Sequence, residues 1–284
     1  MSRTSLSGTR LPRHESGCLL SHSIPIPGVA MTVTTTDAAS LATQYTEQGY
    51  VLVKGLLTRN EAAAYRQVAH DLLRHLDGDE DPTWGSAAGL AAGSPTRLQH
   101  LHDAQFYDAA FSRLLMDDRF TSVASAVLGG PNVQLHHTKL FVKPPENGSP
   151  FPPHQDHPFF PHTHHRVAAA IFHFDDAPEE KGCVRVVPRS HLQGPRPHDP
   201  EGGYHLTDVP FEAAVPLPAE AGDVLFFSYL SIHASGVNVS QEARTTWLVQ
   251  FRDPADPPTV KTHDESLGQG MMLRGVDPTG RRNM

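Results

Sequence analysis

The sequence contains very little cysteine. Its 284 residues include two cysteines, Cys18 and Cys183, which excludes a disulfide framework and a zinc site built from several thiolates. No apolar run reaches the roughly 20 residues that cross a bilayer. Residues 1–30 also lack the continuous apolar segment of a secretory signal. We therefore expect a cytoplasmic protein without a membrane segment.

Basic residues are scarce as well. Lys and Arg together number 23 against 31 Asp and Glu, which gives a formal net charge of −8. Nucleic acids and anionic membrane surfaces are bound by clustered Lys and Arg. The composition therefore disfavours both partners and favours a small-molecule substrate, and it leaves the oligomeric state open.

The length is compatible with one large domain. We expect a single domain over residues 31–284, in which Met31 offers a second plausible start. Residues 1–30 are rich in Ser, Pro and Arg, and we expect them to form a disordered extension.

The first half of this domain has helical patterns. Thr58 and Glu61 have the spacing of a capping box, which marks the start of a helix. A strand-like run covers residues 50–57, and the acidic and then Gly/Ala-rich residues 78–94 read as a mobile loop that could close over a site. The predicted helices are residues 37–49, 59–76, 105–117 and 118–128.

After Gly130 the pattern changes to short β-rich runs separated by Pro and Gly clusters. The predicted strands are residues 133–142, 167–174, 184–187, 224–227 and 245–251. A helical layer followed by a series of strands predicts an α+β domain built on an antiparallel sandwich or barrel.

A candidate metal site begins at His154 and Asp156. In an extended strand, residues i and i+2 point to the same face, so both side chains would share one face. His233 is the best third ligand, because it ends a strongly apolar run late in the β region. Two imidazoles and one carboxylate are typical of non-haem Fe(II) oxygenases, which keep coordination positions open for their substrates.

Arg244 stands eleven residues after His233, where the next strand is predicted to begin. A guanidinium is suited to bidentate capture of a carboxylate. A dicarboxylate co-substrate would require such a residue.

Together these motifs resemble the phytanoyl-CoA dioxygenase family of Fe(II)/2-oxoglutarate-dependent oxygenases. The resemblance spans residues 40–255 and rests on Gly130-Pro131-Asn132, Lys143-Pro144-Pro145, His154-Gln155-Asp156, Phe159-Phe160-Pro161, Gly182-Cys183-Val184, Pro188 to His191, His233-Ala234-Ser235-Gly236, Asn238 and Arg244. It implies a double-stranded β-helix, the cupin-like jelly-roll fold, with an N-terminal helical layer.

The same resemblance implies the roles of individual residues. His154, Asp156 and His233 would bind Fe(II), and Arg244 with Ser235 would bind the distal carboxylate of 2-oxoglutarate. Two further residues, Lys143 and Phe172, would line the co-substrate pocket. Dioxygen would be the second co-substrate.

Several residues have simpler structural interpretations. Gln155 points away from the ligands in an ideal strand and is expected to pack, and Cys183 is expected to be a small buried apolar residue. Arg189 stands where the family usually has glycine, so a positive φ there would be costly. We expect ordinary structural or surface roles for His157, His162, His164 and His165.

The resemblance implies hydroxylation of an aliphatic carbon, with release of succinate and CO2. Asp156 disfavours halogenation, since halogenating relatives replace this carboxylate with a small residue. We favour a small metabolite of secondary metabolism as the substrate. Three alternative functions stay open: an acyl-CoA hydroxylase, a non-redox cupin-type metal-binding protein, and a catalytically silent binding protein. Desaturation, ring formation and oxidative demethylation use the same iron site and stay open as reaction outcomes.

Overall fold

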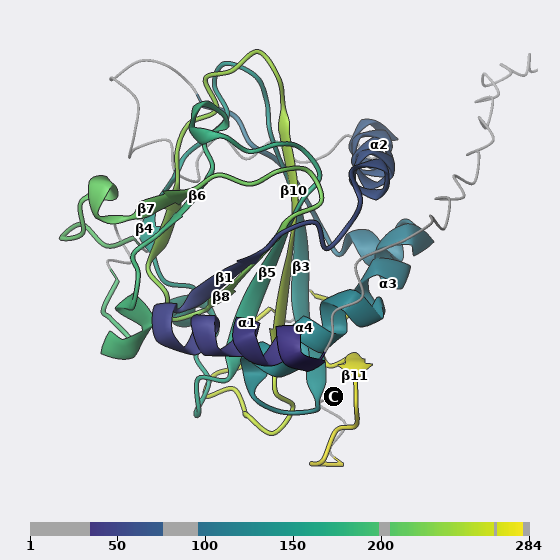
Figure 1. The fold of residues 1–284 in the computed structure, drawn as a ribbon, viewed down its shortest axis with the longest axis vertical. Coiled ribbons are helices and arrows are strands. Elements are labelled where there is room, and N and C mark those ends of the chain that lie inside the picture. Colours follow the sequence, from purple (N-terminus) through teal and green to yellow (C-terminus); the bar gives the residue numbers. More distant parts are fainter. Residues whose placement is uncertain (1–34, 76–95, 199–204, 264–265, 281–284) are drawn as a thin grey trace, which may run out of the picture.

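The computed structural model describes residues 35–75, 96–198, 205–263 and 266–280 (Figure 1). The predicted extension over residues 1–30 lies outside these ranges, as does the whole of the predicted loop over residues 78–94. The α-helices are α1 Thr35–Gln48, α2 Arg59–His75, α3 Ala109–Leu115 and α4 Asp118–Leu128. No helix of the described ranges combines the length and apolar character needed to cross a bilayer.

The four predicted helices are present, and one of them is shorter than expected. The capping box forms, because the backbone N–H of Thr58 donates to Glu61 Oε2 (2.7 Å) and that of Glu61 donates to Thr58 Oγ1 (3.2 Å). The predicted helix over residues 105–117 is interrupted at Asp108, which instead caps α3 by accepting from the N–H of Ala110. The helix α4 ends as predicted at Gly129, whose φ of 66° is the left-handed C-cap conformation.

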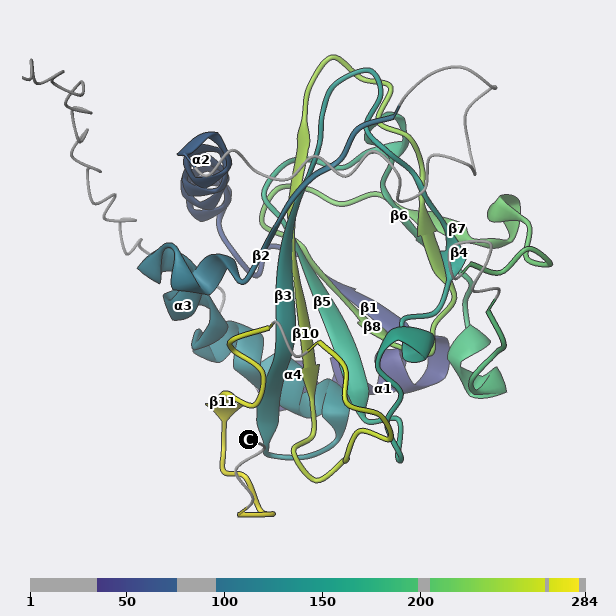
Figure 2. The same cartoon turned by 180° about the vertical axis from the view of Figure 1, so that it is seen from behind.

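Strands form two antiparallel sheets that face each other (Figure 2). The larger sheet has the order β1-β8-β5-β10-β3-β11, with β2 also paired to β3, and the smaller has the order β4-β9-β6-β7. This is the predicted jelly-roll architecture with its helical layer. The strands are β1 Tyr50–Val53, β2 Gln99–His102, β3 Val133–Lys143, β4 Phe151–His154, β5 Val167–His173, β6 Val184–Val186, β7 Val215–Leu217, β8 Val224–Ser228, β9 His233–Ser235, β10 Arg244–Arg252 and β11 Met272–Arg274.

The five strands predicted after Gly130 correspond to β3, β5, β6, β8 and β10. The strand-like run over residues 50–57 is shorter than predicted: β1 ends at Val53, and Gly55 turns the chain with a φ of 60°. The sequence did not reveal β2, β7, β9 or β11, each of which has only three or four residues, and β4 corresponds to the extended segment expected at His154.

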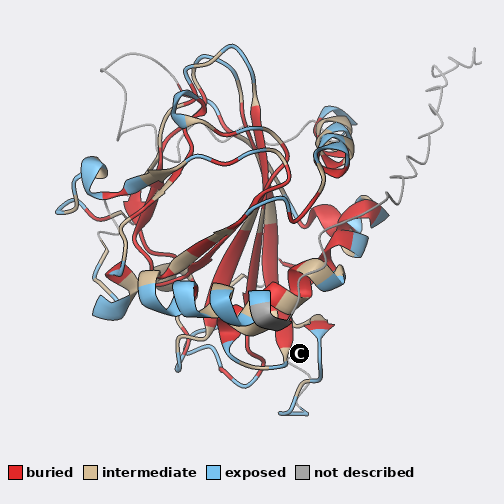
Figure 3. Cartoon of the chain, in the orientation of Figure 1, coloured by how far each residue is buried: buried red, intermediate tan, exposed pale blue. Residues whose placement is uncertain are grey.

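The larger sheet separates an apolar core from a cavity. Its outer face packs against the helices, and this layer is buried along the strands (Figure 3). Phe111 of α3 and Phe120 of α4 are fully buried there, against Trp247 and Phe172 of the sheet. Because side chains alternate along a strand, the other residues of these strands face the smaller sheet. The candidate site lies between the two sheets.

Candidate functional site

The two histidines of the predicted metal site come from paired strands. His154 is the last residue of β4 and His233 is the first of β9, and the two are direct partners in the antiparallel register. Their ring centroids lie 4.2 Å apart. Neighbouring strands therefore hold residues together that are far apart in the sequence.

Asp156 does not continue the strand, so the expected extended geometry is wrong at this residue. Its backbone is helical (φ −76°, ψ −23°) and it precedes the short 3₁₀ helix His157–Phe159. The carboxylate nevertheless points to both histidines, with Oδ1 3.8 Å from His154 Nε2 and 3.7 Å from His233 Nε2. One donor atom from each side chain lies within 4.8 Å of the other two.

Hydrogen bonds leave the right atoms available for a metal ion. His154 Nδ1 lies 2.7 Å from the carbonyl of Pro152, and His233 Nδ1 lies 3.1 Å from that of Ser231. A carbonyl only accepts, so each Nδ1 carries the hydrogen and each Nε2 keeps its lone pair. Burial lowers the pKa of His154 well below its usual value, which keeps this ring neutral, as metal binding requires.

Gln250 of β10 orients the carboxylate of Asp156 through the oxygen that does not face the histidines. Its Nε2 donates to Asp156 Oδ2 at 2.6 Å, which leaves Oδ1 directed at the histidines. The sequence analysis did not identify this residue. One signal was present: Gln250 lies six residues after Arg244, an even spacing that places both on the same face of a strand.

The three side chains line a cavity of about 360 Å³ between the sheets. Its wall includes the apolar side chains of Phe159, Phe160, Phe227 and Leu248, and the ring of Phe227 lies 4.5 Å from that of His233. Arg244 and Ser235 line it too, along with Thr246 and Gln250 of β10. The lining also includes several nitrogen-bearing side chains: His100, His102, His137, Lys139 and His263.

Arg244 begins β10, as predicted, and its guanidinium is buried at the cavity. Its Nη1 donates to the carbonyl of Gly182, while its Nε is buried with no hydrogen-bond partner. Burial lowers the pKa of Arg244 to about 10. A carboxylate placed here would supply the missing acceptor and the missing negative charge.

Lys143 lies directly opposite Arg244 in the pairing of β3 with β10. Its ammonium donates to Ser235 Oγ at 2.7 Å and to the carbonyl of Gly236 at 2.6 Å. Burial and the neighbouring Arg244 lower the pKa of Lys143 well below its usual value. The structure thus brings Lys143, expected in the co-substrate pocket, next to Arg244 and Ser235, the two residues expected at the distal carboxylate.

Gly182 explains why the Gly-Cys-Val motif accompanies this site. It has a φ of 65°, and a Cβ at this position would lie 2.2 Å from the carbonyl oxygen of Gly236. Only glycine permits this approach, which positions the carbonyl that binds Arg244. The next residue, Cys183, is buried and free, as expected.

Phe172 is the one predicted pocket residue that lies elsewhere. It is fully buried on the outer face of β5, where its ring packs against Phe120 and Trp247. The cavity is lined instead by its neighbour Ile171. Because alternate side chains point to opposite faces, an error of one residue moved the prediction to the wrong side of the sheet.

The remaining expectations have mixed outcomes. Gln155 is buried, and its side-chain amide donates to the carbonyls of Gly194 (3.0 Å) and Leu230 (2.6 Å), so it packs as expected. Arg189 does adopt a positive φ, 65°, where the family usually has glycine. Neither group of metal-compatible side chains among the described residues includes His157, His162, His164 or His165.

Comparison with known proteins agrees with this geometry. The model of the family described as "Phytanoyl-CoA dioxygenase (PhyH)" matches residues 45–246. The peroxisomal phytanoyl-CoA dioxygenase of Rattus norvegicus is 30% identical over 220 residues, which are 70% of this chain and 64% of the rat protein. The methylphosphonate hydroxylase of Gimesia maris is 25% identical over 226 residues, which are 80% of this chain and 84% of that protein.

The chain spans less than two thirds of the length of the first mammalian relatives, with 41% of the Bos taurus protein and 64% of the rat protein covered. Among solved structures, the epimerase SnoN in complex with Fe3+, alpha ketoglutarate and nogalamycin RO is 26% identical. That comparison has a TM-score of 0.67 and covers 86% of this chain and 98% of SnoN. With the family model matching most of its length, this chain belongs to the phytanoyl-CoA dioxygenase family.

Proposed function

We propose that this protein is a non-haem Fe(II)- and 2-oxoglutarate-dependent dioxygenase that hydroxylates an aliphatic carbon of a small metabolite. One observation carries the proposal: a two-histidine, one-carboxylate donor set shares a cavity with a buried arginine that lacks an anionic partner among the described residues. The first feature suits Fe(II) with open coordination positions, and the second suits a dicarboxylate.

The donor set fits a metal ion in its chemistry as well as its position. His154 and His233 would bind through Nε2, because their Nδ1 atoms donate to backbone carbonyls. Asp156 would bind through Oδ1 while Gln250 holds Oδ2. Fe(II) bound there would activate dioxygen and couple decarboxylation of 2-oxoglutarate, to succinate and CO2, to oxidation of a substrate C–H bond.

The remaining residues would orient 2-oxoglutarate. Arg244 would pair with the distal carboxylate, and Lys143 would add its positive charge while donating to Ser235. The apolar wall formed by Phe159, Phe160 and Phe227 would limit water near the donor set. These contacts favour an oxygenase over a cupin-type protein that only binds metal, since such a protein needs neither buried cation.

A small metabolite is favoured over an acyl-CoA thioester. The cavity volume is about 360 Å³, at the lower end of the usual range for ligand sites, about 300 to 1,000 Å³. The chain as a whole is acidic, with a net charge of −8, which disfavours a polyphosphate group at its surface. We also propose a cytoplasmic location, because two cysteines in 284 residues give no disulfide framework.

The test is succinate release by anaerobically iron-loaded protein on admission of oxygen, without added substrate. We expect slow uncoupled turnover in the wild-type protein and none in Asp156→Ala, because loss of the carboxylate removes a metal ligand. Anaerobic titration with 2-oxoglutarate should give the visible charge-transfer band of its Fe(II) chelate. An iron-loaded protein that gives no such band and shows no heat of 2-oxoglutarate binding would overturn the proposal.

A further inference from the structure

Lys139 occupies the cavity wall formed by β3. It lies opposite Leu248 of β10 and opposite His102 of β2, so it is flanked by strands on both sides. Its ammonium forms no hydrogen bond or ion pair with the described residues. The side chain is partly buried, and this desolvation lowers its pKa, against the attraction of Asp156. A partly desolvated ammonium without a direct partner favours a negatively charged group at this position.

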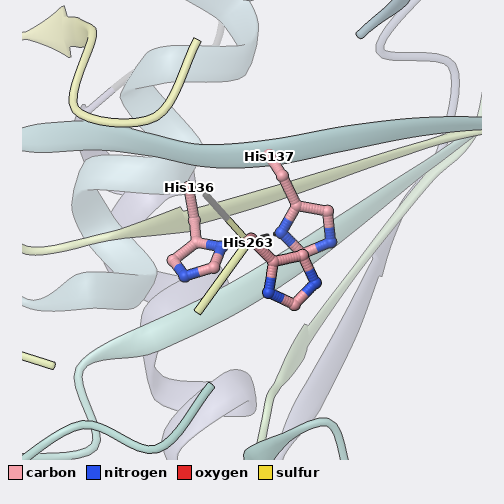
Figure 4. A group of neighbouring side chains, drawn as sticks. All are labelled: His136, His137 and His263. Atoms are coloured by element: carbon pink, nitrogen blue, oxygen red, sulfur yellow. Dashed lines mark hydrogen bonds between the residues drawn. The ribbon is translucent and has the colours of Figure 1, made fainter. Parts of the chain in front are cut away.

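A β-bulge places two histidines beside this lysine. Gln250 pairs with His137 and the next residue, Phe251, pairs with Leu135, so His136 is an extra residue in β3. The bulge turns the rings of both His136 and His137 to the same side of the strand, where they meet His263 (Figure 4). His137 and His263 line the cavity with Lys139.

Hydrogen bonds determine which nitrogen of His137 carries the hydrogen. Gln269 Nε2 lies 3.3 Å from the carbonyl of Thr262 and 3.3 Å from His136 Nε2, so the amide nitrogen donates and His136 Nε2 accepts. The hydrogen of His136 is then on Nδ1, which lies 2.7 Å from His137 Nδ1 (Figure 4). His137 accepts there and carries its own hydrogen on Nε2, so this cavity-lining side chain has a hydrogen to donate.

The three histidines also resemble a metal site, because one nitrogen from each lies within 4.8 Å of the others. Their orientation argues against one. The rings of His137 and His263 are stacked at 4.3 Å with an angle of 17° between planes, and the lone pairs of nearly parallel rings do not converge on one ion. The two Nδ1 atoms of His136 and His137 are also joined to each other by a hydrogen bond.

We propose that Lys139 and His137 bind an oxyanion of the prime substrate, either a carboxylate or a phosphonate. The inference rests on the proposed function and adds the substrate class. Asp156 is the only carboxylate among the described residues of the cavity wall, and a metal ion would neutralise it. Lys139 is four residues from Lys143, roughly 13 Å along the strand, so it lies well away from the distal carboxylate of 2-oxoglutarate.

Calorimetry with anionic and neutral probes tests this site. Methylphosphonate represents a phosphonate, isobutyrate a carboxylate, and isobutyramide the uncharged analogue of isobutyrate. We expect at least one anion to bind the wild-type protein, and isobutyramide to bind much more weakly than isobutyrate if the carboxylate is the preferred group. Measurements on metal-free protein and on the Fe(II)–2-oxoglutarate complex separate anion binding from failure of the co-substrate site.

Variants assign the binding to these residues. Lys139→Met should weaken binding of the anion about tenfold or more, because a charged hydrogen bond is lost, whereas Lys139→Arg should retain it. Gln269→Leu should weaken it less, since Gln269 is a positioning residue that acts through His136. Lys54→Met removes an exposed lysine that pairs with Asp223 and should leave binding unchanged.

Three results would overturn the proposal. The first is an absence of preference for either anion over isobutyramide. The second is a Lys139→Met protein with weakened 2-oxoglutarate binding and normal anion binding, which would assign the lysine to the co-substrate. The third is a second equivalent of bound Zn²⁺ that His154→Ala retains and His263→Ala loses, which would make the histidines a metal site.

Discussion

Arg244 and Lys143 lie directly opposite each other on β10 and β3, both are buried, and neither forms an ion pair within the described ranges. Two like charges on directly opposite strand positions destabilise the protein unless an anion binds between them. Burial has lowered the pKa of both side chains, that of Arg244 to about 10. The pair is therefore organised for a ligand at the expense of stability.

Replacing Lys143 should raise the stability of the ligand-free protein and lower its affinity for 2-oxoglutarate. The Lys143→Met protein without ligand is expected to gain about 1 kcal/mol in free energy of unfolding, because a buried cation is removed. Its affinity for 2-oxoglutarate should fall about tenfold or more, since one charged contact is lost. Urea denaturation and anaerobic titration measure the two effects, and lost stability with unchanged affinity would show that Lys143 serves the fold alone.

The affinity for 2-oxoglutarate should also depend on pH. The lowered pKa means that Lys143 binds fewer protons in the folded protein than in the unfolded chain, so it makes stability rise with pH between its folded pKa and about 10.5. The bound carboxylate favours the charged amine, so binding takes up a proton and affinity should decline as pH rises through this window. Dissociation constants at several pH values should show a slope that Lys143→Met lacks.

Gln250 should control metal affinity through Asp156. Gln250→Leu removes the donor to Asp156 Oδ2 and frees the carboxylate to rotate. We expect metal affinity to fall about 10- to 100-fold, as is typical when a group that orients a ligand is lost. Competition with a chelator for bound Co²⁺ measures this. Gln134→Leu, which changes a buried glutamine outside the cavity, is the matched control.

Substitutions at the neighbours Ile171 and Phe172 should have different effects, one mainly on ligand affinity and the other mainly on stability. Phe172→Ala removes a ring from the core beneath the helices, so we expect a loss of about 3 to 5 kcal/mol with unchanged 2-oxoglutarate affinity in the folded fraction. Ile171→Ala changes the cavity wall and should alter ligand affinity at a smaller cost in stability. Denaturation and titration measure the two effects. If Ile171→Ala lost more stability and Phe172→Ala altered ligand affinity, Phe172 would belong to the cavity wall and Ile171 to the core.

Acid should unfold the protein through its buried histidines. Burial lowers the pKa of His136 and His137 well below the usual value, and that of His173 to about 4. The unfolded chain therefore binds more protons below about pH 6.5, and stability is lost as pH falls toward the folded values. Three such residues give a maximal slope of about 4 kcal/mol per pH unit. Urea denaturation at pH 7 and 5.5 measures it, and His173→Gln should reduce the slope.

Local chemistry was readable from the sequence. The capping box at Thr58 and the glycine stop at Gly129 each depend on residues a few positions apart, so composition and spacing were sufficient. Short β-rich runs between Pro and Gly clusters likewise predicted the central strands, because strand-forming residues and the turns that bound them are local signals. The metal ligands and Arg244 were also identifiable, because a specific chemistry requires those residue types in that order.

Only the tertiary structure decided how these pieces meet. The bond from Gln250 to Asp156 joins residues 94 positions apart, and β4 and β9, which carry the histidines, are too short to show a periodic pattern. The sequence also left open which face of the sheet each side chain occupies. Because side chains alternate with a period of two, a single bulge brings His136 and His137 to one side, and a one-residue offset exchanges Phe172 for Ile171. The register that decides which face each side chain occupies is fixed by strand pairing, which exists only in the folded sheet.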